Sequence, residues 1–424
     1  MRIIILVLIL FILSPGSYGL QLLDGLLEDA LIFEASSPRL AGYLETERGT
    51  AGSAFRSNNM VNGRDININN SSLRFYSILP LAEKKSALIV SSENNNSHFS
   101  AVQDPAALDI TGGSNLVSLF YAARLNDRLD VGLGVNQAKN EQENGRDLGF
   151  SYRIRFSPLQ SLAIEYGAEN SRLGNTATIG YGQDRFISPA DGTQNMEMVA
   201  VNYKPADKFG FRGVLGKSGH EQSIGMNATD DRYTYARLDR EAVYGSIGVE
   251  VNRDRLDLNF DLLASATDLN SSGGLFGFIS PDLVLDGESI DKTADLAARV
   301  RAGGMRVGTE RSVSDRLKFK ADLSYLKLLF DGDAKTWNSW FFGMVRKLDS
   351  ESALPVDSAD VLAGGLGVKY MLNNNCEINY SFKQLIPIAV VKRESGANDS
   401  YSEINVGSAV SGGNTQTFAV AWYF

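Results

Sequence analysis

The sequence contains few of the residues on which most enzyme and metal chemistry depends. Among its 424 residues there is one cysteine, Cys376, and there are two histidines, His98 and His220. A single cysteine excludes an intrachain disulfide framework and a cysteine-clustered zinc site. Basic residues are also in the minority, with 41 Lys and Arg against 50 Asp and Glu, whereas a nucleic-acid groove needs clustered positive charge. We therefore expect no nucleic-acid partner, no metal and no cofactor.

Long apolar runs are missing as well, apart from one at the N-terminus. Arg2 precedes an apolar run from Ile3 to Leu13, and Ser17–Gly19 supplies the small residues of a cleavage site. The run is shorter than the roughly 20 residues that a membrane-spanning helix needs. We interpret 1–19 as a Sec-type signal peptide. The mature chain would then begin at Leu20, carry a net charge of 40 − 50 = −10, be exported, and have no transmembrane helix.

From about residue 40 to the C-terminus, apolar and polar residues alternate, which is typical of strands with two unlike faces. The clearest run places Leu148, Phe150, Tyr152, Ile154 and Phe156 between Gly149, Ser151, Arg153 and Arg155. Similar runs follow near 162–169, 243–251, 256–262 and 317–325. The composition agrees with a strand-and-turn protein, because 41 Gly stand against only 10 Pro.

The connections between these strands are short and long in turn. Seven short polar turns fall near 82–85, 126–127, 158–159, 205–207, 253–254, 314–315 and 373–375. Eight longer segments fall near 48–70, 96–114, 140–147, 171–195, 218–240, 268–296, 330–360 and 389–414. Fifteen connections predict sixteen strands, within a range of 14 to 18. The first strand, near Leu40–Thr46, and the third, near Ala87–Ser91, are the least marked.

An even number of strands joined by sequential hairpins, with both chain ends on the short-turn side, is typical of bacterial outer-membrane barrels. A soluble β-sandwich would show the same alternation, but it would need neither a signal peptide nor this rhythm of connections. The predicted fold is therefore all-β, a transmembrane antiparallel up-and-down β-barrel over 39–424. We expect it in the bacterial outer membrane, in contact with membrane lipid and lipopolysaccharide.

Residues 20–38 precede the barrel. Leucines recur through this segment at roughly helical spacing, between Asp24, Glu28 and Asp29, which predicts a short amphipathic helix. Such a helix would lie at the periplasmic mouth, partly plug the lumen, or dock a partner. A mobile N-terminal extension is the alternative.

The chain ends on alternating aromatic and apolar residues, with Phe418, Val420, Trp422 and Phe424 on one face. A final phenylalanine after such a pattern resembles the strand that outer-membrane proteins present to the barrel-insertion machinery. Ala419 stands where that pattern usually has glycine. The resemblance implies that this machinery is a partner of the protein.

If the apolar faces meet lipid, the intervening charges line the lumen. The residues we expect to set its selectivity are Arg153, Arg155, Glu250, Asp257, Asp261, Arg299, Arg301, Lys318, Lys320 and Lys369. One hypothesis is that these charges pair across strands and only satisfy each other. The other is that they create a basic strip or transverse field that selects solutes in a water-filled pore.

The arrangement as a whole resembles the porin superfamily of Gram-negative outer membranes. That resemblance implies passive diffusion of small hydrophilic solutes, often through trimers. The third long segment, 140–147, is too short to fold inward as in general porins, so any constriction is built differently. Asp104–Leu108 resembles the Asn-Pro-Ala motif of long-chain fatty-acid transporters of the outer membrane, but we favour a coincidental Asp-Pro turn as its explanation. A transporter of hydrophobic substrates and a structural or export-associated barrel are therefore the alternatives.

Catalysis is not expected. Both histidines fall in segments predicted to be outer loops, and neither is surrounded by the nucleophile and orienting partner that acyl-transfer chemistry needs. Cys376 follows a predicted turn and is interpreted as a small residue at a strand end. The aromatic run 337–342 would pack within its loop or at the upper aromatic girdle, or else line a contact site.

Overall fold

The structure is a computed structural model that describes residues 40–45, 48–62, 66–81, 85–103, 106–139, 146–181, 184–224, 232–278, 291–340, 345–354, 356–392 and 411–424. The expected signal peptide (1–19) and amphipathic helix (20–38) lie outside these ranges, as do Asp104 and Pro105. Within them, no helix is long and apolar enough to cross a membrane.

The described chain consists almost entirely of antiparallel strands. The elements are α3 (Leu40–Glu45), β1 (Thr50–Asn62), β2 (Ile66–Leu81), β3 (Ser86–Gln103), β4 (Ala106–Asn126), β5 (Leu129–Lys139), β6 (Arg146–Leu159), β7 (Leu162–Tyr181), β8 (Asp184–Ala206), β9 (Phe209–Ile224), β10 (Arg232–Arg253), β11 (Leu256–Phe278), β12 (Asp291–Ser314), β13 (Leu317–Trp340), β14 (Val345–Ala353), β15 (Val356–Asn373), β16 (Cys376–Lys392) and β17 (Ser411–Tyr423).

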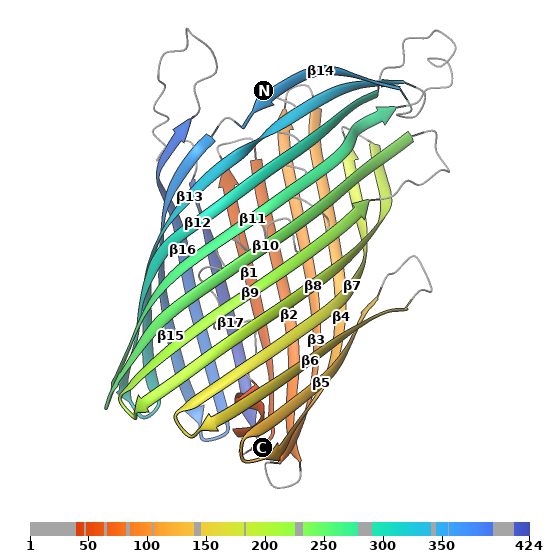
Figure 1. Ribbon diagram of the computed structural model, residues 1–424. Helices are drawn as coiled ribbons and strands as arrows, with labels where there is room; N and C mark the ends of the chain where they lie inside the picture. The colour runs from red at the N-terminus through yellow and green to blue at the C-terminus, as the bar shows by residue number, and fades with distance from the viewer. Residues whose placement is uncertain are drawn as a thin grey trace.

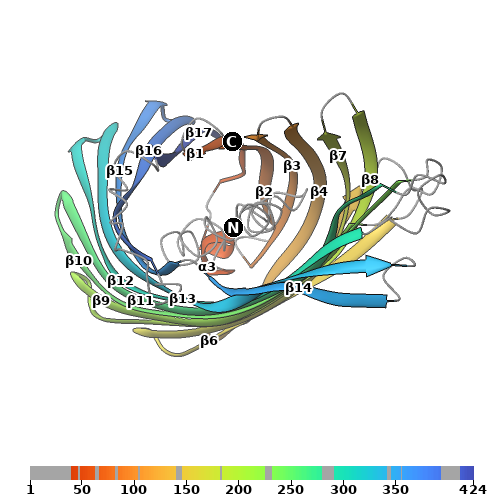
Figure 2. The ribbon, with the colours of Figure 1, turned by 90° about the horizontal axis from the view of Figure 1, so that it is seen from above.

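Sixteen of these strands close into a barrel, as the alternation predicts. Each pairs with its neighbours in the chain, and β1 pairs with β17, which completes the ring seen in Figures 1 and 2. The seventeenth strand, β14, pairs along the upper end of β13, whereas β15 pairs with the lower part of β13. The tight turns lie at one end, where the C-terminus also lies (Figure 1). Six of the seven predicted short turns are confirmed to within about two residues, and the first, near 82–85, lies mostly outside the described residues.

The first predicted strand is wrong. Residues Leu40–Glu45 form the helix α3, and the first strand is β1, which begins at Thr50. Leu40, Tyr43 and Leu44 recur at helical spacing and share one buried face. A search for alternating apolar and polar residues does not detect this spacing. The third strand is confirmed as β3 and is longer than expected.

Several of the predicted long loops are strands for most of their length. β10 to β13 run for 22 to 24 residues, about twice the 9 to 11 that a tilted strand needs to cross the apolar layer. Figure 1 shows them rising as a tall wall on one side of the barrel. On the opposite side, β5 and β6 form a short hairpin, and β4 pairs directly with β7 above it.

An apolar belt surrounds the outside of the barrel. On β12, Met305 and Val307 face outward and are 47% and 48% exposed. Arg301 and Arg311 lie on the same face, above and below them. The ten residue steps from Arg301 to Arg311 span about 34 Å along a strand, or about 24 Å in height at a 45° tilt, which matches the roughly 25 Å apolar band of outer-membrane barrels. The architecture is therefore that of an outer-membrane β-barrel.

Candidate functional site

Most residues predicted to line the lumen do point inward. Arg153 and Arg155 alternate along β6 with Tyr152, Ile154 and Phe156, which are 41%, 43% and 46% exposed on the lipid side. The inward residues of the predicted set are Arg153, Arg155, Glu250, Asp257, Asp261, Lys318, Lys320 and Lys369. Two members of the set, Arg299 and Arg301, do not join them.

The prediction that Arg299 and Arg301 line the lumen is wrong. They share the outward face of β12 with Met305, while Val300 and Ala302 point inward and are almost fully buried. Arg299 binds Asp268 on the outward face of β11, with Nη2 to Oδ2 at 3.1 Å, and this hydrogen bond holds the pKa of the Asp268 carboxyl below its usual range. Within the membrane the apolar residues of a strand face outward, toward lipid. Above the membrane the outer face meets water, so the apolar residues face inward instead.

The inward charges are joined in pairs along the wall. Arg153 lies 3.3 Å from Glu165, and Arg155 lies 3.5 Å from Asp130. Near the short turns, Lys369 lies 2.9 Å from Glu377. These distances support the hypothesis that many of the lumen charges satisfy each other across strands.

One pair reaches across a glycine. Arg212 on β9 and Asp261 on β11 are both opposite Gly248 of β10. The guanidinium contacts both carboxylate oxygens of Asp261 at 2.7 Å. A Cβ at Gly248 would collide with Oδ1 of Asp261, so the glycine lets this ion pair lie flat against the wall.

The inward faces of the upper strands carry an apolar cluster, 1% to 9% exposed, that the charge pattern did not predict. We call it the apolar lumen patch; it consists of Leu263, Ala302, Leu326, Leu328, Ala359, Val361 and Ala363, with Phe330 and Leu385 packed against them. All lie on inward faces of β11 to β16. The sequence does contain a signal for this patch on β13. Phe319 and Leu323 stand at odd positions and face lipid, whereas Leu326 and Leu328 stand at even positions and face the lumen.

The helix α3 lies inside the barrel, as Figure 2 shows from above, and near the short-turn end, as Figure 1 shows from the side. Leu40 and Leu44 are almost fully buried, and they pack with Tyr43 against inward residues of β3 and β4, namely Ala87, Ile89 and Ala122, with Phe120 alongside. The rings of Tyr43 and Phe120 are 5.8 Å apart. The backbone N–H of Leu40 donates to Oε1 of Glu165 at 3.3 Å. The helix therefore narrows the lumen at this end.

A cavity of about 200 Å³ adjoins α3 within the barrel. We call it the lumen cavity. Its wall combines charged, amide and apolar side chains from β2 to β8, among them Tyr43, Arg74, Glu93, Phe120, Asn136, Arg153, Glu169, Met196 and Met198. A cavity with this mixture suits a small molecule that has both polar and apolar parts.

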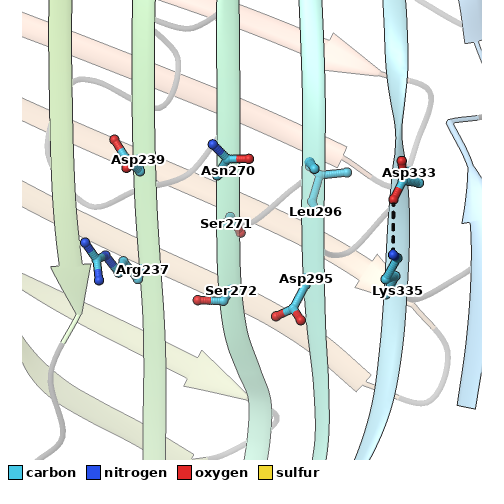
Figure 3. A pocket seen from close by; sticks show the side chains of 10 residues that line it. Arg237, Asp239, Asn270, Ser271, Ser272, Asp295, Leu296, Asp333 and Lys335 are labelled. Atoms are coloured by element: carbon cyan, nitrogen blue, oxygen red, sulfur yellow. Dashed lines mark ion pairs between the residues drawn. The ribbon is translucent and has the colours of Figure 1, made fainter. Parts of the chain in front are cut away.

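A second hollow, of about 380 Å³, lies on the tall wall of β10 to β13. Figure 3 shows Arg237 and Asp239 on one side of it and the Asp333–Lys335 pair on the other. Arg237 and Lys335 also pair with Glu221 and Glu351, at 2.6 and 3.0 Å. Both cations of its lining are thus paired, and the described residues contain no cluster of three acidic, histidine or cysteine side chains that could hold a metal ion.

The remaining candidate residues lie on strands. His98 is on β3 and His220 is buried on β9, so their expected placement in loops is wrong. Cys376 is buried at the start of β16 with a free thiol.

The final strand presents the aromatic face that the sequence predicts. Phe418, Trp422 and Phe424 are 45%, 56% and 65% exposed on the outer surface, and Val420 lies between them on the same face of β17. The lipid-facing position leaves these side chains accessible from outside the barrel.

No protein-family model matches the chain, and no curated protein matches it. Among solved structures, the translocator domain of the autotransporter NalP from Neisseria meningitidis is 8% identical with a TM-score of 0.40, covering 97% of this chain and 99% of that one. The CymD monoaromatic hydrocarbon channel is 9% identical with a TM-score of 0.43, covering 91% of each chain. A Pseudomonas aeruginosa FadL homologue is 10% identical with a TM-score of 0.42, covering 90% of this chain and 92% of that one. Likenesses of this strength say nothing about what the chain transports.

Proposed function

We propose that the protein is an outer-membrane channel for small molecules that carry an apolar part. The observation that supports this most is the apolar lumen patch, because a purely hydrophilic route has no need of inward leucines. The members of the patch are 1% to 9% exposed, so an apolar solute gains free energy there as it displaces the side chains that cover them, in proportion to the area it buries. Ion pairing along the wall also limits the field that would select simple ions.

Passive diffusion of small hydrophilic solutes is the second candidate. The inward charges between the patch and the short-turn end support it, since charges in a barrel of this size are stable only in contact with water or with each other. The two candidates differ in the solute that enters faster: a molecule with an apolar part in the first, and a small hydrophilic solute in the second.

The test compares two probes in bacteria with an intact outer membrane that express the protein. Uptake of N-phenyl-1-naphthylamine, followed by its fluorescence, reports an apolar route. Hydrolysis of a hydrophilic β-lactam by a periplasmic β-lactamase reports a hydrophilic one. The double variant Leu326→Ser, Leu328→Ser makes the patch polar. Ser324→Ala, at the inward position just below on β13, is the matched control.

We expect the wild type to accelerate uptake of the apolar probe several-fold over cells without the protein. The double variant should lose most of this increase, whereas Ser324→Ala should keep it. If the double variant is folded, as judged by its heat-modifiable mobility in gels, and the apolar probe still enters at the wild-type rate, the patch does not guide permeation. Acceleration of the β-lactam alone would favour the hydrophilic channel.

A further inference from the structure

Two charged side chains in the lumen cavity differ from the paired charges described above. Arg74 on β2 and Glu93 on β3 are directly opposite each other in register, and both line the cavity. Even so, neither forms a hydrogen bond or an ion pair with the other or with any other residue in the described part of the chain. Among these described residues the Nε atom of Arg74 is buried without an acceptor. Within the described part of the chain, a cation and an anion thus stand side by side and neither is paired.

Such groups are costly unless something satisfies them. Buried polar atoms in proteins nearly always have partners, and charged ones need them most. Arginine binds carboxylates through two parallel N–H···O bonds, and a glutamate accepts readily from an ammonium group. Opposed residues of neighbouring antiparallel strands have Cβ atoms about 5 Å apart, so one ligand can present its own anion and cation to both.

The rest of the cavity suits an apolar group. Tyr43 and Phe120 supply aromatic rings, and Met196 and Met198 supply flexible thioethers that adapt to a ligand's shape and contact aromatic rings favourably. The volume, about 200 Å³, suits one small molecule.

We infer that the lumen cavity binds free α-amino acids with apolar side chains. The α-carboxylate pairs with Arg74, the α-ammonium pairs with Glu93, and the side chain packs against the rings and methionines beside α3. This assignment rests on the proposed channel function, within which it names a class of solute.

The test is isothermal titration of the full-length mature protein in detergent with three probes that share one ring. L-phenylalanine carries both charges, 3-phenylpropionate lacks the ammonium, and 2-phenylethylamine lacks the carboxylate. We expect L-phenylalanine to bind at least tenfold more tightly than either analogue. Equal affinities for all three, or no binding of L-phenylalanine, would overturn the inference whether or not any variant folds.

Variants then assign each charge to its partner. In Arg74→Gln, L-phenylalanine should bind no better than 2-phenylethylamine, because the carboxylate has lost its partner. In Glu93→Gln it should bind no better than 3-phenylpropionate. Arg56→Gln, at a lumen-side arginine on β1 outside the cavity lining, is the matched control and should leave all three affinities unchanged. A wild-type preference that both cavity variants retain would place the binding elsewhere and overturn the assignment.

The two proposals fail separately. Accelerated uptake of N-phenyl-1-naphthylamine without binding of L-phenylalanine would leave the channel proposal standing and remove the amino-acid site. Binding of L-phenylalanine without faster entry of the apolar probe would leave a ligand site in a barrel that is not the proposed apolar channel.

Discussion

Loosening α3 should open the short-turn end of the barrel. Leu40 and Leu44 are 0% and 2% exposed where the helix packs against β3 and β4. Burial of a leucine side chain contributes about 1.5 to 3 kcal/mol, so Leu40→Ser together with Leu44→Ser removes about 3 to 6 kcal/mol from docking of the helix. Because about 1.4 kcal/mol corresponds to a factor of ten, the ratio of docked to undocked helix should fall by about a hundredfold to about ten-thousandfold.

Single-channel conductance in a planar bilayer measures this change. We expect the double variant to show larger or more frequent conductance steps than the wild type. Gly42→Ala is a control of opposite sign: a Cβ there meets nothing within 4 Å, and alanine stabilises a helix by about 1 kcal/mol relative to glycine. It should leave conductance unchanged or lower it. Wild-type conductance from a folded double variant would refute the idea that α3 restricts permeation.

Three further expectations concern ion pairs. Asp261→Ala should destabilise the barrel by about 3 kcal/mol, because it leaves the charge of Arg212 uncompensated; urea unfolding in lipid vesicles measures the loss, and Arg212→Met with Asp261→Leu should recover most of it. The pKa of Asp268 is lowered by its hydrogen bond to Arg299, so the pair stabilises the fold at neutral pH and ceases to do so as the pH falls through that lowered pKa; in Arg299→Gln, carboxyl ¹³C NMR should find the pKa of Asp268 closer to its usual value. Reversal potentials of Arg299→Gln under a salt gradient should equal those of the wild type, since Arg299 faces outward, and a shift toward cations would contradict that placement.

The parts of the fold that follow one physical rule could be predicted from the sequence. The alternation on β6 indicates a lipid face and a lumen face, and it placed Arg153 and Arg155 correctly. The polar turns fixed the strand count, because each interrupts an alternating run. Phe424 and the residues before it on β17 face lipid, as the aromatic pattern indicates.

The errors arise where the environment changes along a strand. Arg299 and Arg301 were assigned to the lumen because Val300 and Ala302 were assumed to face lipid, yet this part of β12 lies at or above the upper edge of the apolar belt. A sequence pattern shows which face is dry but not which side of the barrel that face is on. The apolar lumen patch depends on packing among several strands, and the lack of a partner for Arg74 among the described residues depends on its surroundings in the barrel. No local pattern reports either.

The height of the β10 to β13 wall has a consequence for how the barrel is assembled. The upper parts of these strands carry charges on their outward faces, and these charges must cross the apolar layer while the chain inserts. An isolated arginine at the bilayer midplane costs about 2 to 4 kcal/mol in a barrel. If β11 and β12 cross as a hairpin already closed by Asp268 and Arg299, the two charges cross as a neutral pair. Insertion should therefore proceed by paired strands on this side, and its rate should fall when one charge of such a pair is removed.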